Sequence, residues 1–376
     1  MQGEGAAEIT VAQDQSDLQH IQAFKYQVYV EELGRYGDIA DHQAALLVET
    51  DDATSRNLLV EMDGKLVATA RLTWGGDKGA LQQRQIDQYD LAPILDSVTL
   101  DQIVICERLM IAPGCRGGDL LMQMFDWMMR FVNTHRIQLF IGDCEPHLIN
   151  TYQAMGFRTY TAKHVNSPAT GYLIPLMIVA EDVEYLRQLG SPLVQSLKEF
   201  GDADRVPDSL DLILSGGDAV QSEQLVPAAE YLAQLEQAAA EAGSFERGLF
   251  EHMSAADIAA CIRKSNMIAC NPGDIVIKRG NAARNLNMVL TGAFEVQVEG
   301  RTVAQIGPGE MFGEIAFFLK QPRNADVIAV APSRMISLND RTIKSLSKEL
   351  PATAAMLLNN IARLLCRRLD KMNEFI

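Results

Sequence analysis

Cysteine pairs, basic charge near the N-terminus and long apolar runs are all scarce in this chain. Its six cysteines form no Cys-x-x-Cys pair and have no histidine at partner spacing, which excludes a zinc-ligand pattern and a disulfide framework and favours a reducing cytoplasm. No Lys or Arg precedes Lys25, and no apolar run approaches the ~18 residues of a membrane span. We therefore expect a soluble cytoplasmic protein without a metal site, a signal peptide or a membrane span.

Positive charge is also in deficit over the whole chain. The 33 Lys and Arg residues face 49 Asp and Glu, so the formal net charge is −16. This excludes a broad electrostatic surface for nucleic acid, and no helix-turn-helix pattern follows the last predicted helix. Residues 181–241 hold 13 acidic and 3 basic residues, which indicates a solvated connector. We expect no nucleic-acid partner.

The first half of the 376-residue chain alternates helix and strand patterns, which predicts an α/β layer structure. Apolar residues recur at helical spacing over residues 17–33, and Gly34 ends the pattern. An Asp63-Gly64 pair between two β-prone runs predicts a hairpin. Further expected elements are strands at 103–111, 137–141 and 171–179, helices at 119–131, 146–155 and 181–189, and a tight loop at 112–118.

The second half predicts a β-roll or jelly roll with flanking helices. A short capped helix begins near Ser254, and strand-sized runs follow at 275–278, 286–290, 294–298, 302–306, 325–330 and 335–338, separated by Gly or Pro turns. The last helix, residues 351–375, is amphipathic. Its apolar stripe is open to three interpretations: a helix that moves when a ligand binds, a homodimer seam, or core packing.

Residues 309–325 carry the parts needed to hold a small anion, namely a turn, a short helix, a carboxylate and an arginine nine positions later. The run Phe312-Gly313-Glu314 with Pro322-Arg323 resembles the phosphate-binding cassette of cyclic-nucleotide-binding domains. The resemblance implies that Glu314 accepts from the ribose hydroxyl and that Arg323 neutralises the cyclic phosphate. Backbone amides near Gly313, Ile315, Ala316 and Ala325 would complete the site.

The position after the arginine departs from the usual cassette. It is Asn324 here, where the family commonly has Ala, Ser or Thr and where adenine and guanine ligands are distinguished. Either cAMP or cGMP is therefore the expected ligand. The alternative interpretation makes Glu314 and Arg323 an ordinary ion pair in a roll that binds no nucleotide.

In the first half, a strand is followed by Pro113-Gly114-Cys115-Arg116-Gly117-Gly118, a helix, and Tyr152-Gln-Ala-Met-Gly-Phe157. This order resembles the GNAT superfamily of N-acyltransferases. The resemblance implies that Arg116, Gly117 and Gly118 bind phosphate of the acyl donor and that Tyr152 protonates the departing thiolate.

Residues 18–33, together with the segments around Arg71 and Arg108, are similar to a narrower branch, the acyl-homoserine-lactone and N-acyl amino acid synthases. The resemblance adds Arg71 and Arg108 to the donor-binding residues. It also admits acyl carrier protein beside acyl-CoA as the donor. Asp119 stands where GNAT loops have a small residue, would repel a pyrophosphate, and makes a good N-cap.

Acyl transfer requires a neutral amine, proximity to the thioester and stabilisation of the oxyanion. Glu107, on the strand that enters the loop, is the candidate base. The equally weighted alternative is that Glu107 pairs with Arg71 or Arg108 within the sheet. The acceptor is expected to be a small-molecule amine.

These patterns predict three segments: a GNAT-like N-acyltransferase domain at 1–190, an acidic linker at 191–244 with a helix at 228–241, and a cyclic-nucleotide-binding domain at 245–376. The predicted function is acyl transfer from a thioester to an amine, regulated by cyclic nucleotide. One alternative is a non-enzymatic sensor with a degenerate acyltransferase fold. Another is an autoinducer-like N-acyl amino acid synthase that uses the roll only to dimerise.

Overall fold

The computed structural model describes residues 7–79, 81–167, 169–197, 220–221, 233, 237, 248–263, 265–281 and 285–373. The chain divides into two compact units, of which the N-terminal unit ends at Gly217 and the C-terminal unit begins at Asp218, apart from short segments near residues 145 and 170. The predicted helix at 228–241 lies, except for two single residues, outside the described part. The predicted limits of the three segments stay predictions.

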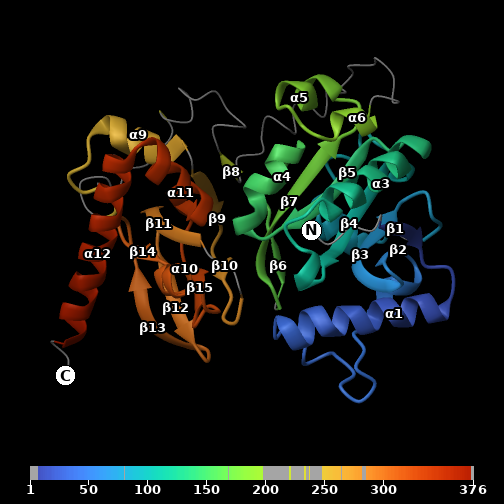
Figure 1. The fold of residues 1–376 in the computed structure, drawn as a ribbon, viewed down its shortest axis with the longest axis horizontal. Helices are drawn as coiled ribbons and strands as arrows, with labels where there is room; N and C mark the ends of the chain where they lie inside the picture. The colour runs from blue at the N-terminus through green and yellow to red at the C-terminus, as the bar shows by residue number, and fades with distance from the viewer. Residues whose placement is uncertain are drawn as a thin grey trace. The chain divides into compact units, whose positions relative to one another are not determined.

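The N-terminal unit is built on a seven-stranded sheet (Figure 1). In spatial order the strands are β1 (Glu8–Val11), β2 (Arg56–Met62), β3 (Lys65–Trp74), β4 (Ile103–Ile111), β5 (Leu139–Cys144), β7 (Gly171–Val179) and β6 (Val165–Ser167). The predicted hairpin is confirmed, because β2 and β3 pair antiparallel across Asp63 and Gly64. β4 and β5 run parallel, joined by a helical crossover.

Helices cover both faces of this sheet. They are α1 (Gln15–Lys25), a π-helix (Tyr26–Glu32), α2 (Gln83–Gln88), α3 (Leu120–Thr134), α4 (Ile149–Met155), α5 (Val183–Gln188) and α6 (Val194–Leu197), with single 3₁₀ turns at Thr50–Ala53, Leu100–Gln102, Pro113–Cys115 and Pro146–Leu148. The face with Cys106 packs on Met128 of α3, while Ile103 and Ile105 join Tyr89 in the core on the opposite face. The first predicted helix differs in one respect, since it continues beyond Lys25 as a π-helix.

The C-terminal unit consists of two antiparallel sheets, as the roll pattern predicts (Figure 1). One sheet has the order β10 (Ile275–Ile277), β15 (Asp326–Ala329), β12 (Phe294–Val298) and β13 (Arg301–Ile306). The other has the order β14 (Met311–Phe312), β11 (Asn285–Thr291), β16 (Ser333–Asn339), β9 (Asn266–Cys270) and β8 (Val220–Gln221). Strands β8, β9 and β14 were not predicted.

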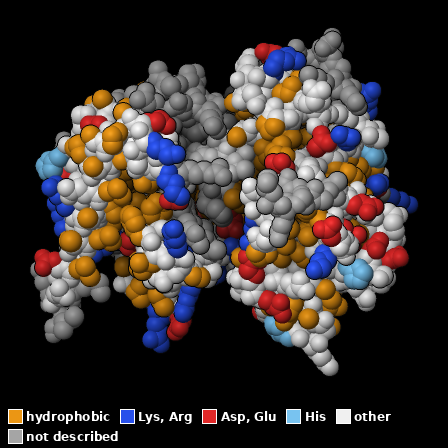
Figure 2. Space-filling model, in the orientation of Figure 1, with side chains coloured by type: hydrophobic (Ala, Val, Ile, Leu, Met, Phe, Trp, Pro, Cys, Tyr) orange, Lys and Arg blue, Asp and Glu red, His pale blue; other side chains and the backbone are white. Residues whose placement is uncertain are grey.

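Among the described residues, four helices accompany the roll: α9 (Ala255–Arg263), α10 (Glu314–Leu319), α11 (Asp340–Glu349) and α12 (Pro351–Asn373). Leu357 and Ile361 of α12 are buried in one core with Phe250 and Met288. Figure 2 shows apolar side chains gathered on the surface in the region of α12, and Leu369 is 60% exposed. Among the helices of the described residues, none is both long enough and apolar enough to span a membrane.

Candidate functional site

The two parallel strands of the N-terminal sheet separate partway along their length. Their pairing runs from Ile103–Leu139 to Cys106–Gly142 and stops there, although β4 continues for five more residues. Just beyond, Arg108 has a φ of +54°. Between the pairs Arg71–Glu107 and Thr69–Met110, β4 has two residues where β3 has one. A non-glycine residue in this conformation marks a β-bulge, which redirects a strand and its side chains. The sheet is thus opened between β4 and β5.

Two carboxylates lie beside this opening. Alternate residues of a strand lie on the same face. Ile105 of β4 pairs with Ile141 of β5, so the next residues on that face are Glu107 and Asp143. The hydroxyl of Tyr89 connects them, 2.7 Å from Asp143 Oδ2 and 3.3 Å from Glu107 Oε1. Tyr89 is fully buried at the end of α2, and its own carbonyl accepts from Tyr160 at 2.6 Å.

Glu107 is also bound on its other oxygen. Arg71 Nη2 lies 3.1 Å from Glu107 Oε2, on the directly paired residue of β3. Burial would lower the pKa of Arg71, but the carboxylates of Glu107 and Glu49 outweigh this effect and raise it. Arg71 is only 3% exposed and stays charged. The structure therefore contains the Glu107–Arg71 pair that the alternative interpretation anticipates.

A buried ionic network surrounds Arg71. Lys25 of α1 is 1% exposed and lies 2.8 Å from both Glu49 and Asp52, while Arg108 binds the two oxygens of Glu49. Burial alone would raise the pKa of Glu49, yet the hydrogen bond and charge of Arg108 hold this pKa well below its usual range. The predicted donor-binding residues Arg71 and Arg108 are thus both engaged by carboxylates of the chain itself.

The loop after β4 presents its predicted residues to solvent. Arg116 donates to both oxygens of Glu32 at 2.6 and 2.9 Å and to the carbonyl of Ile111 at 2.7 Å. A methyl group added at Gly117 or Gly118 would meet no atom, so the loop backbone is open. Asp119 occupies the N-cap position of α3, as expected, although its side chain makes no capping hydrogen bond to the described residues.

Tyr152 lies on α4 with its ring against Phe125 and Phe157. Burial, followed by the negative groups around it, among them Asp143, raises the pKa of Tyr152 well above its ordinary value. Its hydroxyl therefore stays protonated at neutral pH, as a proton donor requires.

A second candidate site lies in the roll and is centred on Arg323. This side chain is 4% exposed, and its guanidinium donates to the carbonyl of Gly313 at 2.6 Å and to the main-chain and side-chain oxygens of Asn285 at 2.8 and 2.7 Å. Its Nε is buried without a hydrogen-bond partner among the described residues. Burial lowers the pKa of Arg323 to about 10. A buried cation held only by neutral oxygens is suited to an anionic ligand.

The other cassette residues surround this cation. Gly313 has a φ of +87°, and an added Cβ would lie 2.5 Å from Arg323 Nη1. Glu314 accepts from Arg368 of α12 at 2.9 Å. Ala316 and Ala325 are buried, whereas Ile315 and Asn324 are exposed. Sequence reasoning missed Asn285 and Arg368, since neither lies in the cassette motif.

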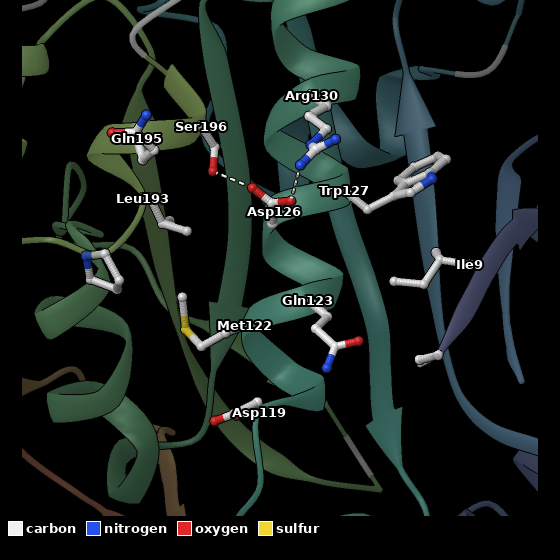
Figure 3. A pocket seen from close by; sticks show the side chains of 12 residues that line it. Ile9, Asp119, Met122, Gln123, Asp126, Trp127, Arg130, Leu193, Gln195 and Ser196 are labelled. Atoms are coloured by element: carbon white, nitrogen blue, oxygen red, sulfur yellow. Dashed lines mark hydrogen bonds and ion pairs between the residues drawn. The ribbon is translucent and has the colours of Figure 1, made fainter. Parts of the chain in front are cut away.

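A separate hollow of about 620 Å³ lies on the outer face of α3 (Figure 3). Met122 and Trp127 line it from α3, Ile9 from β1 and Leu193 from the segment before α6. One of its two carboxylates, Asp126, is bound by Ser196 and by Arg130. Of the residues that the sequence analysis singles out, Asp119 alone is among those that line this hollow. Among the described residues, no group of His, Cys, Asp and Glu is placed to hold a metal ion.

Two family models match separate parts of the chain. Residues 20–178 match the model described as N-acyl amino acid synthase FeeM, and residues 268–349 match the cyclic nucleotide-binding domain. These ranges contain the two sites described above. The α/β fold of the first half and the β-roll of the second are thereby confirmed as the fold class.

Individual relatives each match only part of the chain. Glutaminase 2 of Bradyrhizobium diazoefficiens is 32% identical over 34% of this chain and 20% of its own length. L-ornithine N(alpha)-acyltransferase of Rhodobacter capsulatus is 26% identical over 37% of this chain and 56% of its own length. The solved structure of the AHL synthase LasI is 15% identical with a TM-score of 0.38, over 47% of this chain and 91% of that one. The chain thus spans about half or less of the length of these two curated relatives.

Proposed function

Because residues 20–178 belong to the N-acyl amino acid synthase family and residues 268–349 to the cyclic nucleotide-binding domains, we propose that this protein is an N-acyltransferase controlled by a cyclic nucleotide. One observation carries the proposal: the same chain that has the synthase match also holds Arg323, a buried guanidinium whose hydrogen bonds to the described residues all go to neutral oxygens. The cyclic phosphate would be the missing anion. As part of this proposal the protein is cytoplasmic, in keeping with its six free thiols.

The acyl donor is a thioester, either acyl-CoA or acyl carrier protein. The opening between β4 and β5 gives the thioester access to strand amides that no longer pair, and such amides stabilise an oxyanion. The open loop at Gly117 and Gly118 would hold a phosphate of the donor. The carboxylates at the opening supply the base, and Tyr152 supplies the proton for the thiolate.

The acceptor that we propose is the amino group of an amino acid. The name of the matching family and the activity in the name of the Rhodobacter relative both support this class. L-ornithine is therefore the first acceptor to test. The nucleotide would act by shifting an equilibrium between two conformations, with a coupling of ~1–3 kcal/mol being ordinary for such control.

The test is to measure thiol release from acyl-CoA and from acyl carrier protein with a panel of amino acids, each with and without cAMP or cGMP. Turnover that changes with nucleotide in the wild type, and does not change in Arg323→Ala, is the expected result. Absence of turnover with both donor classes would contradict the enzymatic part. Turnover that no nucleotide affects would contradict the regulatory part.

A non-enzymatic sensor is the second candidate function. It is favoured by the occupation of three predicted donor-binding arginines, since Arg116 is paired with Glu32 and both Arg71 and Arg108 are paired with Glu49. A sensor would bind nucleotide at Arg323 without any acyl transfer. The same assay, combined with calorimetric titration of the nucleotides, separates the two functions.

A further inference from the structure

The two carboxylates at the β4–β5 opening differ in how accessible they are. Glu107 is 8% exposed, and both of its oxygens are engaged, one by Arg71 and one by Tyr89. Asp143, at the end of β5, is half-buried, and its Oδ2 accepts from Tyr89. Because its side chain is less buried, Asp143 is the carboxylate that a ligand in the opening reaches more easily.

The hydroxyl of Tyr89 orients this pair. It has one hydrogen, so it donates to one carboxylate at a time, and it lies closer to Asp143 than to Glu107. Burial, with the charges of Asp143 and Glu107 added, raises the pKa of Tyr89 well above its ordinary value, so the hydroxyl remains a donor. Through Tyr89 and Arg71, the end of β5 is tied to β4 and β3.

The candidate acid packs towards the same strand, since the ring of Tyr152 lies edge-on to Phe157, and Phe157 in turn lies edge-on to Phe140 of β5. Asp143 is among the negative groups that add to burial in raising the pKa of Tyr152. A base and an acid near one opening between strands meet the two proton requirements of aminolysis, namely a neutral amine before attack and a protonated thiol after it.

We propose that Asp143 is a catalytic residue that binds the ammonium group of the acceptor amino acid and takes its proton, with Tyr89 and Glu107 as positioning residues. The inference rests on the acyl transfer proposed above. It assigns to Asp143 the role of base that sequence reasoning assigned to Glu107.

The step balances as follows. The ammonium gives one proton to Asp143 and becomes a neutral amine, whose lone pair attacks the thioester carbonyl. The new C–N bond forms, the carbonyl becomes an oxyanion, and its collapse breaks the C–S bond. The thiolate takes a proton from Tyr152, the nitrogen loses its second proton to that tyrosine, and Asp143 releases its proton to water. The products are an amide, a thiol and one proton.

The test compares full-length wild type with Asp143→Asn, Asp143→Glu and Tyr89→Phe. The asparagine side chain has nearly the same size as aspartate and keeps an oxygen that can accept the hydrogen bond from the Tyr89 hydroxyl. Asp87→Asn is the matched control, because it removes the same charge from an exposed position of α2. Thermal melting monitors folding of each variant, and kcat and KM for the amine are measured over pH 6 to 9.5.

The expected result is that Asp143→Asn lowers kcat/KM by about 10²–10⁴-fold at pH 7, the range that general base catalysis supplies. The loss shrinks at higher pH, where more of the amine is neutral, and with methoxyamine, which is already neutral at pH 7. Asp143→Glu restores part of the activity, Tyr89→Phe lowers kcat by a smaller factor, and Asp87→Asn stays near wild type.

Other titrating groups interact with Asp143 and are accounted for in this profile. They are Tyr89 at the end of α2, Glu107 and Cys106 on β4, Tyr152 on α4 and Tyr160 after it. If the folded Asp143→Asn variant keeps turnover within about threefold of wild type at every pH, the inference is overturned while the acyltransferase function stands. An equal loss with methoxyamine and with an ammonium acceptor would also overturn it, because a purely structural defect affects both. Failure of the wild type itself would instead contradict the proposed function.

Discussion

Arg368 of α12 donates to Glu314 of the cassette helix at 2.9 Å and also to the carbonyl of Met311. The last helix of the chain is thereby tied to the carboxylate that is expected to contact the ribose. A ligand that binds Glu314 is therefore connected to α12 through the Glu314–Arg368 ion pair. The neighbouring Arg367 pairs with Glu251 instead.

We predict that Arg368→Ala uncouples the nucleotide site from α12. A partly exposed ion pair contributes about 0–1 kcal/mol, so the Kd for the nucleotide should change by less than about tenfold. The ratio of acyl transfer with and without nucleotide should fall towards one. Arg367→Ala is the matched control and should keep the nucleotide response. Equal responses in the two variants would show that the Arg368 contact has no part in coupling.

Arg323→Ala is expected to abolish nucleotide binding without unfolding the roll. Burial lowers the pKa of Arg323 to about 10, against the smaller opposing effect of the Glu314 and Glu145 carboxylates, and its hydrogen bonds go to neutral oxygens. Removing it leaves those oxygens unpaired, at about 1–3 kcal/mol. Calorimetry should show no saturable binding, and the rise in Tm that nucleotide produces in the wild type should disappear. Unchanged affinity in the variant would refute the assignment of this site.

Gly313→Ala should impair the same site by a different route. At a φ of +87°, an alanine carries about 1–3 kcal/mol of backbone strain, and its Cβ would lie 2.5 Å from Arg323 Nη1 and 2.9 Å from the carbonyl of Asn285. Gly273→Ala is the control, because Gly273 has a φ of +93° but no atom within reach of an added Cβ. Only Gly313→Ala should lose nucleotide affinity. The same loss in both variants would point to strain alone.

The pH dependence of stability should be traceable to Glu49. Its pKa is lowered in the folded protein, so its contribution is complete above the unfolded value near 4.5 and is lost as the pH falls below it. Both tryptophans, Trp74 and Trp127, lie in the N-terminal unit, so their fluorescence follows its unfolding in the full chain. Glu49→Gln should destabilise this unit by about 3 kcal/mol at pH 7 and flatten its acid sensitivity. An unchanged acid transition would contradict this role.

Local signals in the sequence predicted much of the fold. The Asp63-Gly64 turn, the strand at 103–111 and the cassette helix after Gly313 each depend on neighbouring residues, and each is confirmed. Strand β9 and helix α11 were missed. Residues 266–270 are a short apolar run that does not by itself identify a strand, whereas residues 340–349 carry helical signals that were overlooked, namely the Asn339 cap and the spacing of Ile343 and Leu346.

The site residues were harder to predict because they depend on pairing between distant segments. Asp143 reads as the polar end of a short apolar strand, and only its register with β4 places it beside Glu107. The partners of Lys25, Arg71 and Arg108 come from residues 49–52, which carry no strand or helix pattern. In adjacent parallel strands, residues that follow the last pair on the same face lie near each other. Applied to β4 and β5, this rule would have identified Asp143.

The buried charge of Arg323 also has a practical consequence for handling the protein. A buried guanidinium whose hydrogen bonds to the described residues go to carbonyl oxygens attracts any small anion that fits, so inorganic phosphate or sulfate in a buffer competes with a cyclic nucleotide. Apparent affinities will therefore depend on the buffer, and protein purified in phosphate will show weaker nucleotide binding than protein purified in an amine buffer with chloride.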